Sequence, residues 1–325
     1  MVVTDADTLT QGRFRDPAFD DVKAAALARG GFVHDMLNHV AAYLPGPRDS
    51  DSARTLIVSF DNLSATRETR RMPWGNSFLS ARGWSVMGVM GRLNDWYRHE
   101  DVWDFFDVLR DEGFFKRFDH VAMYGASMGG YGALTFARAA PGCTVLAFAP
   151  QSSLVTELVP FEKRYRYGRK QGDWGGRYSD AAEGVRAAKR AYIVYDPMER
   201  YDRKHVERLD GPNVTALKVP YLGHKIPPQL KRMELLKTLA VPALQGRLTE
   251  AEFHRMFRAR RNSLPWLVGI LDRCLQRGHY RAGLALSEKL MQSEANWKLR
   301  KQHRALQEAV AQMDGAAGGA PQAAE

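Results

Sequence analysis

Residues 121–130 read Val-Ala-Met-Tyr-Gly-Ala-Ser-Met-Gly-Gly, and this stretch decides the fold. The apolar run predicts a buried strand, and the pattern from Tyr131 to Ala140 predicts a helix. A Gly-x-Ser-x-Gly pattern between a strand and a helix places its serine on a strained turn, where the glycines let strand and helix approach closely. We therefore expect Ser127 to be a nucleophile, with the N–H of Met128 directed at the same space. The alternative is that Ser127 only caps the helix.

Tyr124 to Gly130 resembles the nucleophile elbow of the α/β-hydrolase superfamily, and the resemblance covers roughly residues 54–240. It implies a mostly parallel sheet of α/β-hydrolase type with helices on both faces. It also implies a Ser–His–acid triad in the chain order serine, acid, histidine, and an oxyanion hole. The fold class that we expect is α/β, with a lid insertion and a C-terminal helical appendage.

The resemblance implies positions for the acid and the base after two later strands. Asp196 follows the apolar run 191–195 directly, and it is the first candidate for the acid. Asp202 is the alternative; its other interpretation is the N-cap of a following helix. His224 follows the run 214–220, where the superfamily keeps its base, and we expect it to be catalytic.

The second oxyanion donor is implied in the loop after the strand at 54–60. Many lipases and esterases carry a His-Gly-Gly type of sequence there, whereas this chain has Phe60-Asp61-Asn62-Leu63. We expect Asn62, through its backbone or side chain, to complete an oxyanion hole with Met128. The alternative is that Asp61 and Asn62 simply form an Asx turn.

Residues 154–182 have no clean periodicity and contain a basic stretch interleaved with tyrosines. The superfamily often inserts a lid at this point, so we expect a lid that offers positive charge and stacking; the alternative is a solvated surface loop. The expected substrate-binding side chains are cationic or aromatic: Arg67, Arg70, Arg71, Trp96, Arg164 and Arg166.

The length of 325 residues suits one large α/β domain with an appendage. We expect an N-terminal arm and helices over 1–50, the hydrolase domain over 51–245, a helical segment over 246–312 and a disordered tail over 313–325. Within the helical segment, residues 277–283 resemble the turn of a tetratricopeptide-type hairpin. Such helices would pack on the hydrolase domain or on a second copy of the chain, forming a homo-oligomer.

Composition excludes several classes of protein. No apolar run is long enough to span a membrane, and residues 1–20 lack the apolar core of a signal peptide. Two distant cysteines argue against a structural disulfide and fit a cytoplasmic location. No Cys/His cluster has metal-ligand spacing, so neither a metal nor another cofactor is expected. The net charge of +10 favours anionic partners, but no nucleic-acid motif accompanies it, and we expect no nucleic acid.

These features together predict a serine hydrolase that cleaves an acyl ester through Ser127, Asp196 and His224. The expected substrate is a small-molecule or glycan ester, with an anionic one favoured by the arginines. One alternative is a thioesterase or acyltransferase acting on an anionic carrier such as acyl-CoA. Another is a non-catalytic binding subunit with a hydrolase fold, suggested by the unusual sequence around Asn62.

Overall fold

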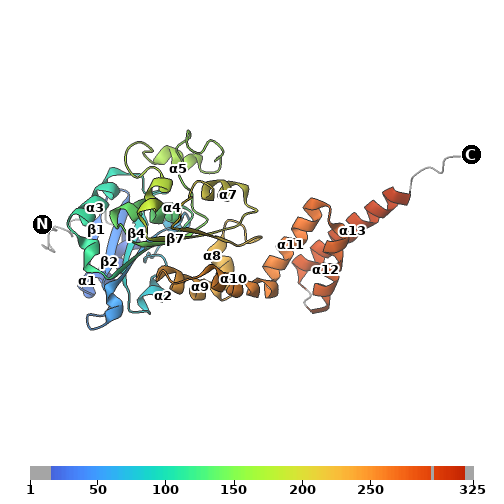
Figure 1. Cartoon of the computed structure of the whole chain (residues 1–325), viewed down its shortest axis with the longest axis horizontal. Helices are drawn as coiled ribbons and strands as arrows, with labels where there is room; N and C mark the ends of the chain where they lie inside the picture. Colours follow the sequence, from blue (N-terminus) through green and yellow to red (C-terminus); the bar gives the residue numbers. More distant parts are fainter. Residues whose placement is uncertain (1–15, 294–295, 319–325) are drawn as a thin grey trace, which may run out of the picture. The chain divides into compact units, whose positions relative to one another are not determined.

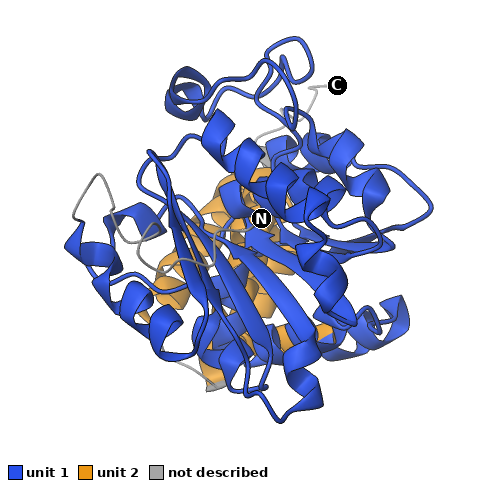
Figure 2. Ribbon diagram, turned by 90° about the vertical axis from the view of Figure 1, so that its left-hand side faces the viewer, with its two compact units in different colours: residues 1–256 blue, residues 257–325 orange. Residues whose placement is uncertain are grey.

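The computed structural model describes residues 16–293 and 296–318. The chain divides into two compact units, Met1–Met256 and Phe257–Glu325, which Figure 2 distinguishes by colour. Most of the predicted N-terminal arm and the end of the predicted disordered tail lie outside the described residues.

The first unit is organised around one sheet of eight strands, in the order β1-β2-β4-β3-β5-β6-β7-β8. The two pairings that involve β2 are antiparallel, and the remaining five are parallel. The strands are β1 (Phe32–Asp35), β2 (His39–Leu44), β3 (Thr55–Phe60), β4 (Ser85–Gly91), β5 (His120–Ala126), β6 (Thr144–Phe148), β7 (Arg190–Tyr195) and β8 (Val214–Lys218).

Helices cover both faces of this sheet. Figure 1 shows α3 and α4 over one face and α2 and α9 over the other. The helices of the unit are α1 (Asp20–Ala28), α2 (Asn76–Ser80), α3 (Glu100–Asp111), α4 (Met128–Thr135), α5 (Arg166–Gln171), α6 (Ala181–Gly184), α7 (Arg200–Val206), α8 (Ile226–Arg232), α9 (Leu235–Leu244) and α10 (Glu250–Phe257). Among the described helices of the whole chain, none is long and apolar enough to cross a membrane.

The central strands are mainly apolar because the sheet is covered on both sides. Every residue of β4 and β6 is buried, as expected for strands in a two-sided parallel sheet. Alternate side chains such as Met123 and Val145 join the core under α3 and α4. The expected α/β-hydrolase type of sheet is thereby confirmed, and its parallel strands end at one edge, where the nucleophile turn lies.

The prediction of helices in the N-terminal segment was wrong for residues 32–44. Their apolar spacing suggested a second helix, but they form the hairpin β1–β2, which pairs with β4 at the edge of the sheet. A local reason is visible at Gly31, where an added Cβ would lie 1.9 Å from the carbonyl oxygen of Tyr43. The decisive contact with β4 is distant in sequence, so periodicity could not reveal it.

The described part of the second unit contains three α-helices, α11 (Leu264–Arg277), α12 (Tyr280–Ser293) and α13 (Trp297–Gly318), preceded by a 3-10 helix over Arg258–Asn262. The predicted turn at 277–283 is present: Gly278, with φ of 73°, ends α11, and α12 begins at Tyr280. Leu271, Leu299 and Leu306 form a small core between the helices. The tail was expected to be disordered from residue 313, but α13 continues to Gly318.

Replacing Gly129 with alanine is expected to destabilise the first unit. The added Cβ would lie 2.4 Å from the carbonyl oxygen of Phe60 and 2.6 Å from that of Asp61, so strand β3 or helix α4 must move. We expect a loss of about 1–3 kcal/mol in the free energy of unfolding, measured by urea denaturation.

Gly130→Ala is the matched control for this variant. Its added Cβ, in the same turn of the helix, would lie 3.0 Å from the Cβ and 3.2 Å from the Cα of Pro150 and 3.5 Å from the carbonyl oxygen of Phe148, which are longer approaches than those at Gly129. Because alanine also favours a helix by about 1 kcal/mol over glycine, this variant should remain close to wild type. Equal urea midpoints for Gly129→Ala and wild type would contradict the close-approach argument.

Candidate active site

Ser127 occupies the turn between β5 and α4, with φ of 53° and ψ of −116°. This conformation is strained for a residue that carries a Cβ, and the surrounding packing holds it in place. Its N–H donates to the carbonyl oxygen of Phe148 (2.8 Å) in the neighbouring strand. An added Cβ on Gly125 would lie 2.0 Å from the oxygen of Gly129, which shows how closely the strand and the helix approach. The predicted strand–turn–helix geometry is present.

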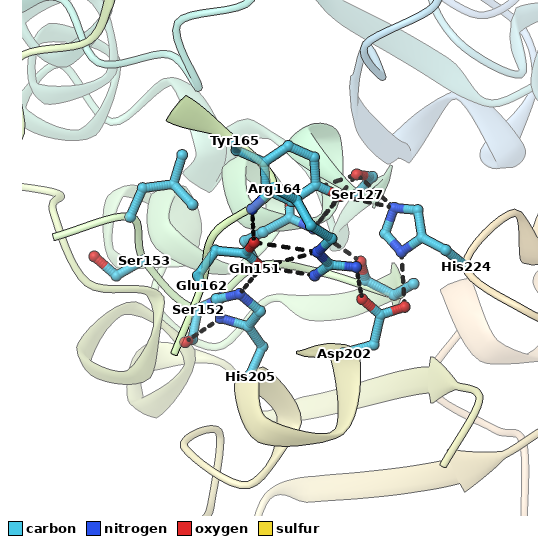
Figure 3. Close-up of polar contacts among 12 residues, drawn as sticks. Ser127, Gln151, Ser152, Ser153, Glu162, Arg164, Tyr165, Asp202, His205 and His224 are labelled. Carbon is cyan, nitrogen blue, oxygen red and sulfur yellow. Dashed lines mark hydrogen bonds and ion pairs between the residues drawn. The ribbon is translucent and has the colours of Figure 1, made fainter. Parts of the chain in front are cut away.

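His224 connects the serine to a buried carboxylate. Its Nε2 lies 3.0 Å from the Oγ of Ser127, and its Nδ1 lies 2.7 Å from the Oδ2 of Asp202 (Figure 3). Asp202 is fully buried in α7, whereas the imidazole is partly exposed in the loop after β8. A carboxylate accepts the Nδ1–H proton, so Nε2 presents its lone pair to the serine hydroxyl. This arrangement can remove a proton from Ser127 and later return it to a leaving group.

The expected contact of Asp196 with the imidazole was wrong. Asp196 is buried at the end of β7, where its Oδ1 accepts from the N–H of Met198 and its Oδ2 accepts from the N–H of Gly223, each at 2.8 Å. It therefore holds the backbone just before His224. The first turn of α7 carries Asp202 to the imidazole instead. Asp202 is also no N-cap, because Glu199 occupies that position.

The two expected oxyanion donors lie at the start of α4 and just after β3. Met128 is the first residue of α4, so its N–H has no acceptor within the helix. The Oδ1 of Asn62 accepts from the N–H (2.9 Å) and the hydroxyl (2.5 Å) of Ser64, so the side chain forms the Asx turn that was the alternative interpretation. Its backbone N–H remains the candidate, since the end of β3 packs against Gly129.

The insertion (residues 154–182) is built into the site rather than being a solvated loop. The guanidinium of Arg164 donates to the Oδ1 of Asp202 (2.8 Å) and to the Oε2 of Glu162 (2.7 Å). Figure 3 shows the guanidinium between these two carboxylates. Arg164 is thus paired twice, which leaves it poorly placed to bind an anionic substrate.

Glu162 anchors the insertion to α7 through His205. Its Oε2 lies 3.0 Å from the Nε2 of His205, whose Nδ1 accepts from the N–H of Ser152 at 3.1 Å. Burial lowers the pKa of His205, consistent with a neutral ring that donates to Glu162. Burial alone would raise the pKa of Glu162, but hydrogen bonds from His205 and Arg164 outweigh it and lower that pKa to about 2. This serine–histidine–carboxylate group is fully enclosed and serves as an anchor.

The other proposed arginines divide into paired and exposed ones. Arg71 is buried, where it forms an ion pair with Asp61 and donates to the carbonyl oxygen of Gly91. Arg70 pairs with Asp21 at 2.7 Å on the surface. Both are therefore engaged within the protein, contrary to expectation. Arg67 and Arg166 are exposed and stay candidates for binding an anionic group.

Gln151 and Tyr165 contact Ser127 and His224 but were not among the predicted site residues. Gln151 is fully buried after β6, and its Nε2 lies 3.4 Å from the Oγ of Ser127. The hydroxyl of Tyr165 lies 3.2 Å from the Nε2 of His224. Trp96, expected to bind substrate, is buried behind them and donates from its Nε1 to the Oε1 of Gln151 (3.0 Å). The signals in the sequence were the position of Gln151 at the carboxyl end of a strand and the place of Tyr165 among the tyrosines expected to offer stacking.

No set of three or more metal-ligating side chains occurs among the residues that the structure describes. The observed chemistry is that of a hydroxyl, an imidazole and a carboxylate in series. Together with the sheet order and the strained serine turn, this places the first unit in the α/β-hydrolase class of folds.

The sequence matches no protein-family model and no curated protein. Solved structures with similar folds include a capsule O-acetyltransferase of Neisseria meningitidis serogroup A, at 13% identity and a TM-score of 0.42, covering 64% of this chain and 93% of that one. Esterase 2 of Thermogutta terrifontis is 12% identical with a TM-score of 0.42, covering 65% and 91%. Carboxyl esterase 2 of Tuber melanosporum is 13% identical with a TM-score of 0.41, covering 70% and 83%. Similarity this distant carries no argument about activity.

Proposed function

We propose that this protein is a serine hydrolase that cleaves acyl esters through a covalent intermediate on Ser127. The observation that supports it best is the continuous series from the Oγ of Ser127 to His224 (3.0 Å) and from His224 to Asp202 (2.7 Å). In this proposal Asp202 is the acid of the triad, in place of Asp196. A partly exposed serine next to a histidine with a buried carboxylate is what nucleophilic catalysis requires.

The proposed reaction has two half-reactions. Ser127 attacks the acyl carbon while His224 takes the hydroxyl proton, and Asp202 holds the imidazole in the required tautomer. The N–H groups of Met128 and Asn62 would stabilise the negative oxygen that forms, and losing one such donor typically costs about 3 kcal/mol of barrier. The proton on His224 then passes to the leaving group as its bond to the acyl carbon breaks. In the second half-reaction, water gives a proton to His224 and attacks the acyl carbon. The bond to Ser127 then breaks, the proton returns to the Oγ of Ser127, and the carboxylic acid is released.

The same acyl-enzyme could transfer its acyl group to an alcohol instead of water, so an acyltransferase is the second candidate. Support for an anionic carrier is weaker than the sequence suggested, because Arg70, Arg71 and Arg164 are paired within the protein. The intact serine–histidine–aspartate series argues against a purely non-catalytic binding role.

Labelling with a fluorophosphonate tests the proposal directly. An activated serine attacks the phosphorus and expels fluoride, so the folded protein should gain one phosphonyl group on Ser127, identified by peptide mass spectrometry. Ser127→Ala and urea-unfolded wild type are the controls, and both should remain unlabelled. Absence of labelling in folded wild type would favour the non-catalytic role.

A further inference from the structure

A tyrosine hydroxyl lies next to the histidine nitrogen that handles the proton. The Oη of Tyr165 is 3.2 Å from the Nε2 of His224, and it reaches this point from the insertion (Figure 3). The ring is held on two sides, by Trp96 at 5.0 Å between centroids and by the guanidinium of Arg164 at 4.9 Å. The hydroxyl is therefore held in place by packing.

The direction of the hydrogen bonds around this hydroxyl follows from Trp96. An indole N–H can only donate, so the atom of Gln151 that faces it at 3.0 Å must be the oxygen. The amide nitrogen of Gln151 consequently faces Tyr165 at 3.5 Å, while both its nitrogen (3.4 Å) and its oxygen (3.5 Å) make long contacts with the Oγ of Ser127. The oxygen of Tyr165 accepts from this side, which leaves its proton directed at the pair formed by Ser127 and His224.

Tyr165 is also a donor at neutral pH. Burial raises the pKa of its phenol to about 12, so the proton stays on the oxygen. The Nδ1–H of His224 donates to Asp202, so Nε2 is an acceptor, and a second donor at this position is compatible with the catalytic tautomer.

The position of the Tyr165 hydroxyl places it close to where the leaving-group atom of a substrate would lie. His224 delivers its proton from Nε2 to the leaving-group atom, which must lie within hydrogen-bond reach of Nε2. The Tyr165 hydroxyl, 3.2 Å from Nε2, reaches such an atom when it lies on the side of Nε2 that faces the insertion. We propose that Tyr165 donates a hydrogen bond to the leaving-group oxygen, and that the site is built for oxygen esters of aliphatic alcohols rather than for thioesters. This inference rests on the proposed function and specifies its substrate class.

The chemical reason lies in the leaving groups. When the tetrahedral intermediate collapses, the bond from the acyl carbon to the alcohol oxygen breaks, and the proton of His224 goes to that oxygen. Tyr165 keeps its own proton and stabilises the negative charge that develops on the oxygen. An alkoxide is strongly basic and needs this help, whereas p-nitrophenolate leaves without a proton. A thioester sulfur is a weak hydrogen-bond acceptor and gains little.

The test compares Tyr165→Phe with wild type on three substrates that share one acyl group: an ethyl ester, a p-nitrophenyl ester and an ethyl thioester. The value of kcat/KM reports acylation in each case. We expect a loss of about 10- to 100-fold for the ethyl ester, as for a hydrogen bond to a developing charge, and less than about threefold for the other two. The matched control is Tyr167→Phe, at an exposed tyrosine two residues further along the same insertion.

The outcomes separate the two proposals. Equal losses on all three substrates, or no loss on the ethyl ester, would overturn the leaving-group role and leave the serine hydrolase standing. A structural role of Tyr165 would produce such equal losses, because it would disturb the triad for every substrate. If wild type cleaves none of the three esters and Ser127 resists the fluorophosphonate, the proposed function and the leaving-group role fail together.

Discussion

Ser127→Ala is expected to lower kcat for a short p-nitrophenyl ester by about 10⁵- to 10⁶-fold, the size of effect that removal of a triad nucleophile produces. The variant keeps the turn between β5 and α4 but lacks the atom that would bond to the acyl carbon. His224→Ala should cause a loss of similar size, because the hydroxyl then has no base at 3.0 Å. The two losses should not add, since both residues act in one step.

Ser77→Ala provides the control, since Ser77 is an exposed serine of the short helix α2 and is not part of the site. Its kcat should equal that of wild type. Circular dichroism and urea midpoints of the inactive variants should confirm that they fold. Full turnover in folded Ser127→Ala or His224→Ala would refute the triad.

Asp202→Asn is expected to lower kcat by about 10⁴-fold while the protein stays folded. An asparagine can present its amide N–H to the Nδ1 of His224, which stabilises the tautomer with the proton on Nε2. That tautomer cannot accept the proton of Ser127. The measurement is kcat on the same ester, with folding checked by near-UV circular dichroism.

Asp196→Asn is the informative comparison, because it makes the same chemical change at the neighbouring buried carboxylate. It removes one acceptor for the N–H groups of Met198 and Gly223, so we expect about 1–3 kcal/mol less stability and a loss of kcat closer to tenfold. If Asp196→Asn were the more damaging of the two for kcat, Asp196 would regain its place as the acid.

The sequence could predict that Ser127 and His224 lie at the same edge of the sheet, because each follows a strand of one parallel sheet. Strand ends in such a sheet share an edge, and the loop after β8 brings His224 to Ser127 there. The carboxylate that contacts His224, by contrast, could not be chosen between Asp196 and Asp202 from the sequence. The choice depends on the path of residues 197–201 and on the first turn of α7, which no local pattern encodes.

The ion pairs that charged side chains form in the structure could not be predicted from the sequence either. The run from Glu162 to Lys170 shows a basic surplus, which suggested a free cationic surface. The structure uses Arg164 internally, because α7 brings two buried groups, Asp202 and His205, to the same place from about forty positions away. The hairpin β1–β2 was missed for the same physical reason, since its stability comes from β4.

The ion pair between Arg164 and Asp202 has a consequence for anyone who wishes to redesign this protein. Exchanging the loops above an active site is a usual way to change what an enzyme accepts. Here a shorter graft in place of residues 154–182 would strip a buried carboxylate of one of its two partners, a loss that generally costs several kcal/mol. Any such chimera has to retain the tetrapeptide from Glu162 to Tyr165, or supply another cation for Asp202.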